Sequence, residues 1–311
     1  MLVGVLAPFS WFLVRDLAPM MEVIAIVLPV AGAAAGALAV VLGWRRRVVG
    51  AATLASVALV CAVATAGPRL AAPSGLPAGE TISFVTANLA TANPDADDLV
   101  RGLAAGYPDV FVTVETSDTA LLALGQVLDR FPYVVEGEPG VRSRVVVYSR
   151  FPLRRLPTLD SMGEAQVVVV EVEPEMGPIT LYAAHLPRPW FSGSDSGHYQ
   201  ATLGEQQRIV DELAAAVAAT EGPTVVAGDL NLTDRGRGYR TLLADGGLTD
   251  VVRQRPAGST SLKWWPFALR IDHVLTRNGM CGSDPARLTL PGSDHRGLWV
   301  NLGPCSDRGS G

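Results

Sequence analysis

The stretch VVAGDLNLT, Val225–Thr233, ends an apolar run with an aspartate and an asparagine that lie two residues apart. Its β-branched and small apolar residues predict a buried strand, with Asp229 and Asn231 at or just beyond its end. A single intervening residue would point both side chains to the same face of an extended chain. A buried carboxylate is costly unless it is paired, hydrated or bound to a metal. Taken alone, Asp229 could also be a turn aspartate, so the stretch has to be weighed together with the rest of the chain.

Beyond Gly67, further polar residues lie at or near apolar runs that resemble strands. They close or follow an apolar run, lie within one, or directly precede one: Asn88, Glu115, His185, Asp272, Asp294 and His295. Any one of them taken alone is more often a cap or turn residue, and His185 alone could be a satisfied core histidine. Together with Asp229 and Asn231 they make eight positions, distributed over six separate strand candidates. That recurrence predicts one site carried by the ends of a rigid scaffold.

The order of strands and helices predicts the fold class. The strand candidates are 81–89, 109–115, 144–149, 166–173, 179–186, 224–230, 271–276 and 296–302, and the helix candidates are 95–105, 119–131 and 204–220. Most neighbouring strands have no helix between them, which favours two packed sheets with helices on the outside.

Residues 1–67 have the pattern of a membrane anchor. Two apolar stretches, 17–44 and 48–67, each match or exceed the roughly 20 residues that a bilayer core requires. They predict two transmembrane helices; two buried helices of a soluble core are the alternative. The stretch 1–14 is short for a span, and whether it forms another membrane helix stays open.

Three arginines, Arg45–Arg47, separate the two spans. Short basic loops stay in the cytoplasm, so we expect the second span to lead outward in a multi-pass cell-membrane protein. The same segment also resembles a signal peptide with a small-residue cleavage site ending at Ala66. Both interpretations place the rest of the chain outside the cytoplasm. The expected organisation is an anchor over 1–67, a Gly- and Pro-rich linker over 68–80, a catalytic domain over 81–303 and a tail over 304–311.

Charge and cysteine content restrict the functional classes. Removing the four arginines and two acids of residues 1–67 from the totals leaves 21 basic and 28 acidic residues, a balance of −7. Readers of duplex DNA usually present a basic surface, so this balance disfavours a DNA partner. Beyond the anchor the chain has two cysteines, Cys281 and Cys305, which in an exported domain either form a disulfide or remain two unpaired, partly buried thiols.

The motifs TANL, VFVTVET, AAHL, GDLNLT, RIDHVLT and GSDHRGLWV occur in that order between about Thr81 and Leu302. Together they resemble the endonuclease/exonuclease/phosphatase superfamily, which includes DNase I-like nucleases, sphingomyelinases and inositol-phosphate phosphatases. The resemblance implies a four-layer α/β/β/α sandwich with its site at one edge of the paired sheets, here preceded by transmembrane helices. The anchored arrangement also resembles, more loosely, VanJ-type glycopeptide-resistance membrane proteins.

The resemblance implies a divalent-metal site. Glu115 would be the principal metal carboxylate, with Asn88 and Asp294 close by. Oxygen ligands of this kind suit Mg²⁺ or Mn²⁺, whereas no cysteine or HExxH pattern indicates zinc. Ser293, directly before Asp294, is a candidate for orienting that loop.

The same resemblance implies roles for the remaining residues in phosphate-ester hydrolysis. His295 would be the general base, with Asp272 holding its other ring nitrogen. His185 would bind a phosphate oxygen or assist the leaving group. Asp229 would orient water or metal, and the Asn231 amide would donate to a phosphoryl oxygen.

Two aromatic loops bear on the substrate. PRPWFSG follows His185 and KWWPFAL precedes Asp272, which predicts a site rim carrying Trp190, Phe191, Trp264 and Trp265. Such side chains could enter the interfacial layer of a bilayer, although ordinary loop packing explains them equally well.

The preferred hypothesis is therefore a membrane-anchored hydrolase of a lipid-linked phosphate or pyrophosphate, with undecaprenyl pyrophosphate as the candidate that the VanJ-type resemblance implies. An exported nuclease, a phospholipid phosphodiesterase and an inactive binding module are the alternatives. The sequence predicts no oligomeric state.

Overall fold

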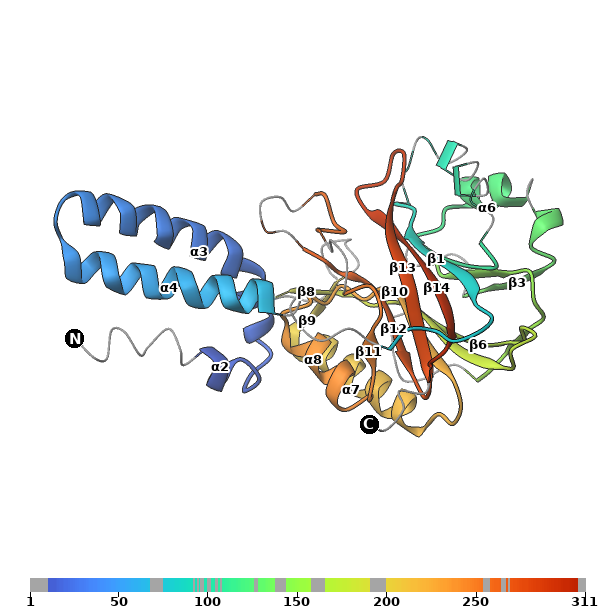
Figure 1. The fold of residues 1–311 in the computed structure, drawn as a ribbon. Coiled ribbons are helices and arrows are strands. Elements are labelled where there is room, and N and C mark those ends of the chain that lie inside the picture. Colours follow the sequence, from blue (N-terminus) through green and yellow to red (C-terminus); the bar gives the residue numbers. More distant parts are fainter. Residues whose placement is uncertain are drawn as a thin grey trace.

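The structure is a computed structural model. It describes residues 11–67, 75–91, 93, 95, 98–99, 102–103, 106, 108–125, 128–137, 144–157, 166–190, 200–253, 258–263, 267 and 269–306. Within these ranges, strands and helices pack into a layered domain from which a helical hairpin projects (Figure 1).

Two six-stranded sheets form the centre of the domain. The first has the order β13 (Met280–Thr289), β14 (Arg296–Pro304), β1 (Ile82–Asn88), β2 (Val110–Val114), β4 (Val146–Ser149) and β3 (Tyr133–Glu136). The second has the order β11 (Thr249–Asp250), β12 (Asp272–Arg277), β10 (Thr224–Asp229), β7 (Ile179–His185), β6 (Gln166–Val172) and β5 (Leu153–Arg155). A separate parallel pair joins β8 (Arg188–Trp190) to β9 (Gln200–Thr202).

Three apolar clusters hold the layers together. The inner cluster lies between the sheets and includes Phe84 and Val112 from the first sheet and Val170 and Val225 from the second. Alternation of side chains along each strand sends the next residues to the outer faces. There, the second sheet packs on α7 (Leu203–Ala219) and α8 (Arg237–Ala244). The first sheet packs on α6 (Asp118–Gly125), which the short helix η3 (Leu128–Arg130) follows. The four-layer α/β/β/α arrangement expected from the sequence is confirmed.

The projecting hairpin consists of α3 (Met21–Trp44) and α4 (Val48–Ala66), preceded by the short helix α2 (Trp11–Val14). Both long helices are long and apolar enough to cross a membrane. Their surfaces expose large apolar side chains, among them Val40 at 73% and Trp44 at 87%, which argues against two core helices of a soluble protein. The turn at Arg45–Arg47 lies at the end of the hairpin farthest from the sheets (Figure 1).

The expected linker and tail meet in the structure. Pro77 bridges Cys305, and the Ala78 amide donates to the Pro304 carbonyl. Cys305 is also joined to Cys281 by a disulfide across the β13–β14 pair. The alternative of two free thiols, which the sequence left open, is therefore wrong.

Several elements differ from the sequence-based expectation. Strands β3, β5, β8, β9, β11 and β13 were not expected. The first span begins at Met21 and not at residue 17, and the candidate helix over 119–131 divides into α6 and η3. Much of the candidate helix over 95–105, and residues 1–10, lie outside the described residues.

Candidate active site

Strand register brings the predicted polar residues to one edge of the paired sheets. At the end of β10, Asp229 lies opposite His185 of the parallel strand β7 and opposite Asp272 of the antiparallel strand β12. In the other sheet, Asn88 ends β1, Glu115 follows β2, and His295 directly precedes β14. The carboxyl ends of two parallel pairs thus meet the amino ends of two antiparallel strands.

Close backbone contact at the end of β10 requires glycine. Gly228 has a φ of 139°, and a Cβ atom there would lie 1.9 Å from the Ala184 carbonyl oxygen of β7. Two residues at the site, Glu115 and Asn231, also have positive φ values, of 52° and 49°. Non-glycine residues in this region are uncommon and cluster at functional sites.

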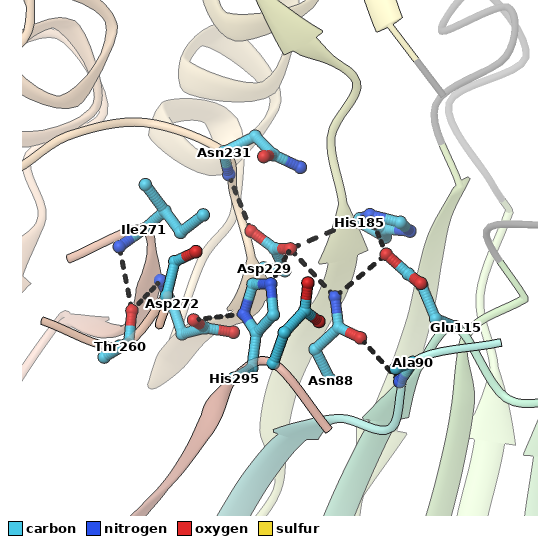
Figure 2. Close-up of polar contacts among 12 residues, drawn as sticks. Asn88, Ala90, Glu115, His185, Asp229, Asn231, Thr260, Ile271, Asp272 and His295 are labelled. Carbon is cyan, nitrogen blue, oxygen red and sulfur yellow. Dashed lines mark hydrogen bonds and ion pairs between the residues drawn. The ribbon is translucent and has the colours of Figure 1, made fainter. Parts of the chain in front are cut away.

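Asp229 lies at the centre of the cluster (Figure 2). Its Oδ2 atom accepts a hydrogen bond of 3.0 Å from the Asn88 amide. The Nε2 atoms of His185 and His295 each lie 3.8 Å from the same oxygen. Its other oxygen, Oδ1, accepts from the Asn231 backbone N–H at 3.0 Å. One buried carboxylate therefore contacts groups from both sheets.

Glu115 faces Asp229 across the Asn88 amide. Asn88 Nδ2 donates to Glu115 Oε1 at 3.1 Å, in addition to Asp229, so one amide bridges two carboxylates. His185 Nε2 lies 3.7 Å from the same Glu115 oxygen, and the Thr91 backbone N–H donates to the other oxygen at 3.3 Å. The Asn88 side-chain oxygen Oδ1 accepts from the Ala90 N–H, so here the Asn88 side chain presents its NH₂ donor to the carboxylates.

His295 is held through its second ring nitrogen. Nδ1 lies 2.9 Å from Asp272 Oδ2, which leaves Nε2 directed at Asp229. The Thr260 hydroxyl oxygen accepts from the backbone N–H groups of Ile271 and Asp272, which fixes the start of β12.

Ser293 fastens the loop that carries His295. Its hydroxyl donates to the Asn88 carbonyl and accepts from the His295 backbone N–H. The loop is therefore tied to the end of β1, on the opposite sheet from Asp272.

Mutual charge effects shift the pKa values of the central groups. Burial alone would lower the pKa of His295, but the carboxylates of Asp272 and Asp229 raise it to about 10. Burial, together with the charge of Asp272, raises the pKa of Asp229 to about 7. Burial would also raise the pKa of Glu115, but the positive charge of His185 lowers it. A buried carboxylate such as Asp229, whose charged form is disfavoured by burial and by a neighbouring carboxylate, is in an environment that a bound cation would stabilise.

The donor set fits a divalent cation. Two overlapping groups, Glu115–His185–Asp229 and Asp229–Asp272–His295, each offer three ligand atoms that lie within 4.8 Å of one another. Carboxylate oxygens dominate, as Mg²⁺ and Mn²⁺ prefer, and the position where the Asn88 amide bridges two carboxylates would suit a small cation.

The structure corrects one sequence-based inference about Asn231. Strand β10 ends at Asp229, and with its positive φ Asn231 leaves the extended conformation, so the two side chains do not alternate along a strand. The Asn231 amide donates instead to the Leu186 carbonyl at 2.8 Å. Asn231 lies beside the cluster, and its amide fastens the loop after β7.

Asp294 lies at the rim and not within the two candidate ligand groups. Its side chain is 41% exposed, and Lys263 Nζ lies 3.9 Å from its Oδ2 atom. Lys263 is the only lysine of the chain. Of the predicted rim aromatics, Phe191, Trp264 and Trp265 and the side chain of Trp190 lie outside the described residues.

A buried charge network beneath Asp272 was missed from the sequence. Arg270, 1% exposed, donates to the carboxylate of Asp250 and approaches Asp234 at 3.4 Å. The Tyr239 hydroxyl donates to the same Asp250 carboxylate at 2.6 Å. Burial opposes the charge on Asp250, but Arg270 holds its pKa far below the usual range. A charged Arg270 two residues before Asp272, within an apolar run, was the available signal.

Comparison with known proteins agrees with this geometry. A family model described as Endonuclease/Exonuclease/phosphatase family matches residues 85–295. An endonuclease/exonuclease/phosphatase from Beutenbergia cavernae DSM 12333 is similar in structure, with a TM-score of 0.58, 20% identity, and coverage of 73% of this chain and 72% of that chain.

Two further structures share the fold. D. rerio TDP2 complexed with single strand DNA product has a TM-score of 0.56 and 16% identity, over 72% of this chain and 99% of that chain. Sphingomyelinase C from Streptomyces griseocarneus has a TM-score of 0.51 and 18% identity, over 72% and 99%. No curated protein matches the chain. At these identities, the structural likeness establishes the fold and not the substrate.

Proposed function

The chain belongs to the endonuclease/exonuclease/phosphatase family, and on that premise we propose that it is a membrane-anchored, divalent-metal-dependent hydrolase of a lipid-linked phosphate or pyrophosphate. Members of this family hydrolyse phosphoester bonds. The observation that carries the proposal is the His295–Asp272 pair directed at Asp229, with Glu115 on the far side of the same cluster.

His295 takes the role of general base in this proposal. Asp272 holds the Nδ1 proton, so the lone pair of Nε2 faces the space beside Asp229 where an attacking water would lie. Asp229 orients that water through the oxygen that Asn88 and the two histidines share. His185, on the Glu115 side, protonates or neutralises the leaving oxygen.

Glu115 and Asp229 would hold the cation. A divalent cation there would neutralise carboxylate charge, favour the basic form of His295 and polarise a phosphoryl oxygen. Asn88 then orients both carboxylates. Asp294 and Lys263 at the rim would contact the outer part of the substrate, where a second phosphate of a pyrophosphate would reach.

The helical hairpin supports a lipid-linked substrate. Two apolar helices with exposed surfaces would fix the domain to a bilayer, where lipid phosphates are the abundant phosphate esters. Undecaprenyl pyrophosphate is the candidate that the VanJ-type resemblance brings. The predicted aromatic rim around Trp190, Phe191, Trp264 and Trp265 would suit the same surface.

Two features support a location outside the cytoplasm. The arginine turn lies at the opposite end of the hairpin from the catalytic domain, so an inside position for the arginines sends the domain outside (Figure 1). The disulfide between Cys281 and Cys305 is typical of oxidising compartments.

A nuclease is the second candidate, because TDP2 with its DNA product has the same fold. Against it stands the balance of 21 basic and 28 acidic residues beyond Gly67. Strand cleavage of single- and double-stranded DNA at low salt therefore has to be measured beside lipid substrates.

The test is hydrolysis by the purified full-length protein in vesicles, with Mg²⁺. It is measured as phosphate release from prenyl pyrophosphates and nucleotides, as headgroup release from phospholipids and as strand cleavage of DNA. We expect release from a prenyl pyrophosphate that a chelator abolishes and that Glu115→Gln lowers at least about a hundredfold. Glu171→Gln, which changes a half-buried carboxylate paired with Arg154 toward the far end of the second sheet, is the matched control. Activity that survives both chelation and His295→Ala would refute the mechanism; DNA cleavage with no lipid hydrolysis would refute the substrate.

A further inference from the structure

The first membrane helix contacts the segment that directly follows the active-site strand β10. Glu22, in the first turn of α3, is 4% exposed. Its Oε1 atom accepts from the Thr233 backbone N–H at 3.4 Å and from the Thr233 hydroxyl at 3.3 Å. Its Oε2 atom accepts from the Gly238 backbone N–H at 3.2 Å. A carboxylate of the anchor is therefore buried against the catalytic domain.

Glu22 supplies the cap that α8 lacks in its own sequence. The residue before α8 is Gly236, which has no side chain to accept from the first N–H groups of the helix. The Glu22 carboxylate accepts from one of these groups, the Gly238 N–H, and a negative charge at this position interacts favourably with the helix dipole. A Cβ atom on Gly236 would lie 1.9 Å from Glu22 Oε1, so the contact requires glycine.

Arg235 makes the reciprocal contact, from the catalytic domain into the anchor. Its Nε atom donates to the Ala25 carbonyl at 2.6 Å, and Nη2 donates to the carbonyls of Ile26 and Phe267 at 3.3 and 2.9 Å. In a regular helix, the Ala25 carbonyl would accept from the residue four positions later, which is Pro29 and has no N–H. Arg235 thus fills a hydrogen-bond position that a proline inside the membrane helix leaves open.

The two contacts lie at the level of the bilayer surface. A helix of 24 residues is about 36 Å long, against about 30 Å of hydrocarbon, so about one turn of α3 extends beyond the core. Trp44, exposed at the other end, is a residue type that lies at a membrane interface, which places the excess at the Glu22 end. Asp229 precedes Arg235 by six residues and therefore lies within about 20 Å of it.

We propose that Glu22, Pro29 and Arg235 form a dock that fixes the active-site edge of the catalytic domain at the headgroup level of its own membrane. The role that we assign to this dock rests on the proposed function. The dock would make the enzyme select phosphate groups of lipids in its own bilayer over phosphates in bulk water. The anchor then acts as a positioning element and not as a flexible tether.

The test uses full-length protein in vesicles and three dock variants. Glu22→Ala removes the carboxylate, Gly236→Ala fills its position, and Pro29→Ala gives the Ala25 carbonyl a partner within α3 while leaving the catalytic domain unchanged. Gly204→Ala, at a helical glycine with open space around it, is the control for Gly236→Ala. Leu38→Ala, at an exposed position of α3, is the control for the anchor variants.

Two measurements are made on each protein. The first is hydrogen exchange of the Thr233 and Gly238 amides, which does not depend on activity. The second is the ratio of two hydrolysis rates, for a long-chain prenyl pyrophosphate in the vesicle and for a five-carbon prenyl pyrophosphate in water. We expect each dock variant to speed the exchange at least tenfold and to lower this ratio at least tenfold, with the rate in water within about threefold of wild type. The controls should behave as wild type.

Two results would overturn the dock. One is exchange of the two amides in the wild-type protein as fast as in an exposed loop. The other is an equal loss of both rates in the Pro29→Ala and Glu22→Ala variants, which indicates a general structural defect. If the wild-type protein hydrolyses no phosphate ester, the proposed function fails, and with it the purpose assigned to the dock; slow amide exchange that the variants abolish would then still establish the contact itself.

Discussion

Replacing Asp272 with asparagine isolates the effect of its charge on His295. The rise in the His295 pKa from 6.5 to about 10 corresponds to about 5 kcal/mol of preference for the protonated ring. Burial opposes this rise, and of the three carboxylates that cause it, Asp272, Asp229 and Asp294, Asp272 contributes most. Assigning it about half of the effect predicts that Asp272→Asn lowers the pKa by about two, or roughly 2–3 kcal/mol.

The sign of the stability change follows from the same shift. Because folding raises the His295 pKa, the stabilisation is fully present below pH 6.5 and is lost as the pH rises through about 10. Asp272→Asn should therefore lower the free energy of unfolding by about 2–3 kcal/mol at pH 6, with a smaller loss near pH 10. Turnover at neutral pH should fall by a factor of about 10²–10⁴, as in other His–Asp pairs.

The assay is a pH titration of the His295 ring by ¹⁵N NMR in metal-free protein, followed by the rate–pH profile with Mg²⁺. Asp294→Asn is the control for the titration, because this more exposed carboxylate ranks below Asp272 and Asp229 among the groups that raise the pKa. A His295 pKa unchanged in Asp272→Asn, with turnover within twofold of wild type, would refute the assignment of Asp272 as the group that holds His295.

Three further predictions concern stability and metal binding. Asp250→Asn leaves the buried guanidinium of Arg270 without its main partner and should lower the free energy of unfolding, measured with urea, by about 3–5 kcal/mol. A loss below about 1 kcal/mol would contradict the role assigned to this ion pair. Cys281→Ala removes the disulfide to Cys305, which closes a sequence separation of 24, and should lower the free energy of unfolding by about 3 kcal/mol. The wild-type protein with its disulfide reduced should show a similar loss. Because burial and neighbouring charge raise the Asp229 pKa to about 7, Mg²⁺ affinity should increase between about pH 5 and pH 7, where the metal no longer has to displace this proton. Calorimetry in two buffers of different protonation enthalpy measures the proton released on binding. An Mg²⁺ affinity that does not change over this pH range would contradict the reasoning.

The buried strands were predictable because their composition matches their environment. β1, β2, β7 and β10 are covered on both faces and therefore read as runs of apolar residues. β13 was not predictable for the opposite reason. It is an edge strand with an irregular register between Ser283 and Ala286, and its sequence MCGSDPARLT contains a glycine and a proline. Proline is tolerated at such an edge or bulge, but it removes the pattern of a strand.

The active-site residues were recognisable because each lies at or near an end of an apolar run, which is a local signal. The contacts among them are not local. The bridge from Asn88 to Asp229 spans 141 positions, and it forms because the two sheets that carry these residues pack face to face. The conformation of Asn231 was missed because the sequence carries no signal for a positive φ directly after a strand. The stretch that contains Asn231 fits an extended chain equally well.

The contact between the anchor and α8 was beyond sequence reasoning altogether. Glu22 and Gly238 are separated by 216 positions, and Glu22 taken alone fits the headgroup position that its place near the end of a span indicates. Only the folded chain shows that the carboxylate points into another domain and that Pro29 frees a carbonyl for Arg235.

If α3 and α4 span a membrane as proposed, these contacts also make attachment of the catalytic domain to that membrane independent of an unbroken peptide chain. A protease that cut between Gly67 and Leu76 would sever the backbone joining α4 to the first sheet, yet the bonds from Glu22 and Arg235 would still hold the two fragments together. The cleaved protein is then a non-covalent complex of two fragments. Release of the catalytic fragment depends on the dissociation constant of that complex as well as on the cleavage. In that proposed arrangement, release of the catalytic domain from the membrane would require that cleavage be followed by dilution or by a competitor for the Glu22 carboxylate.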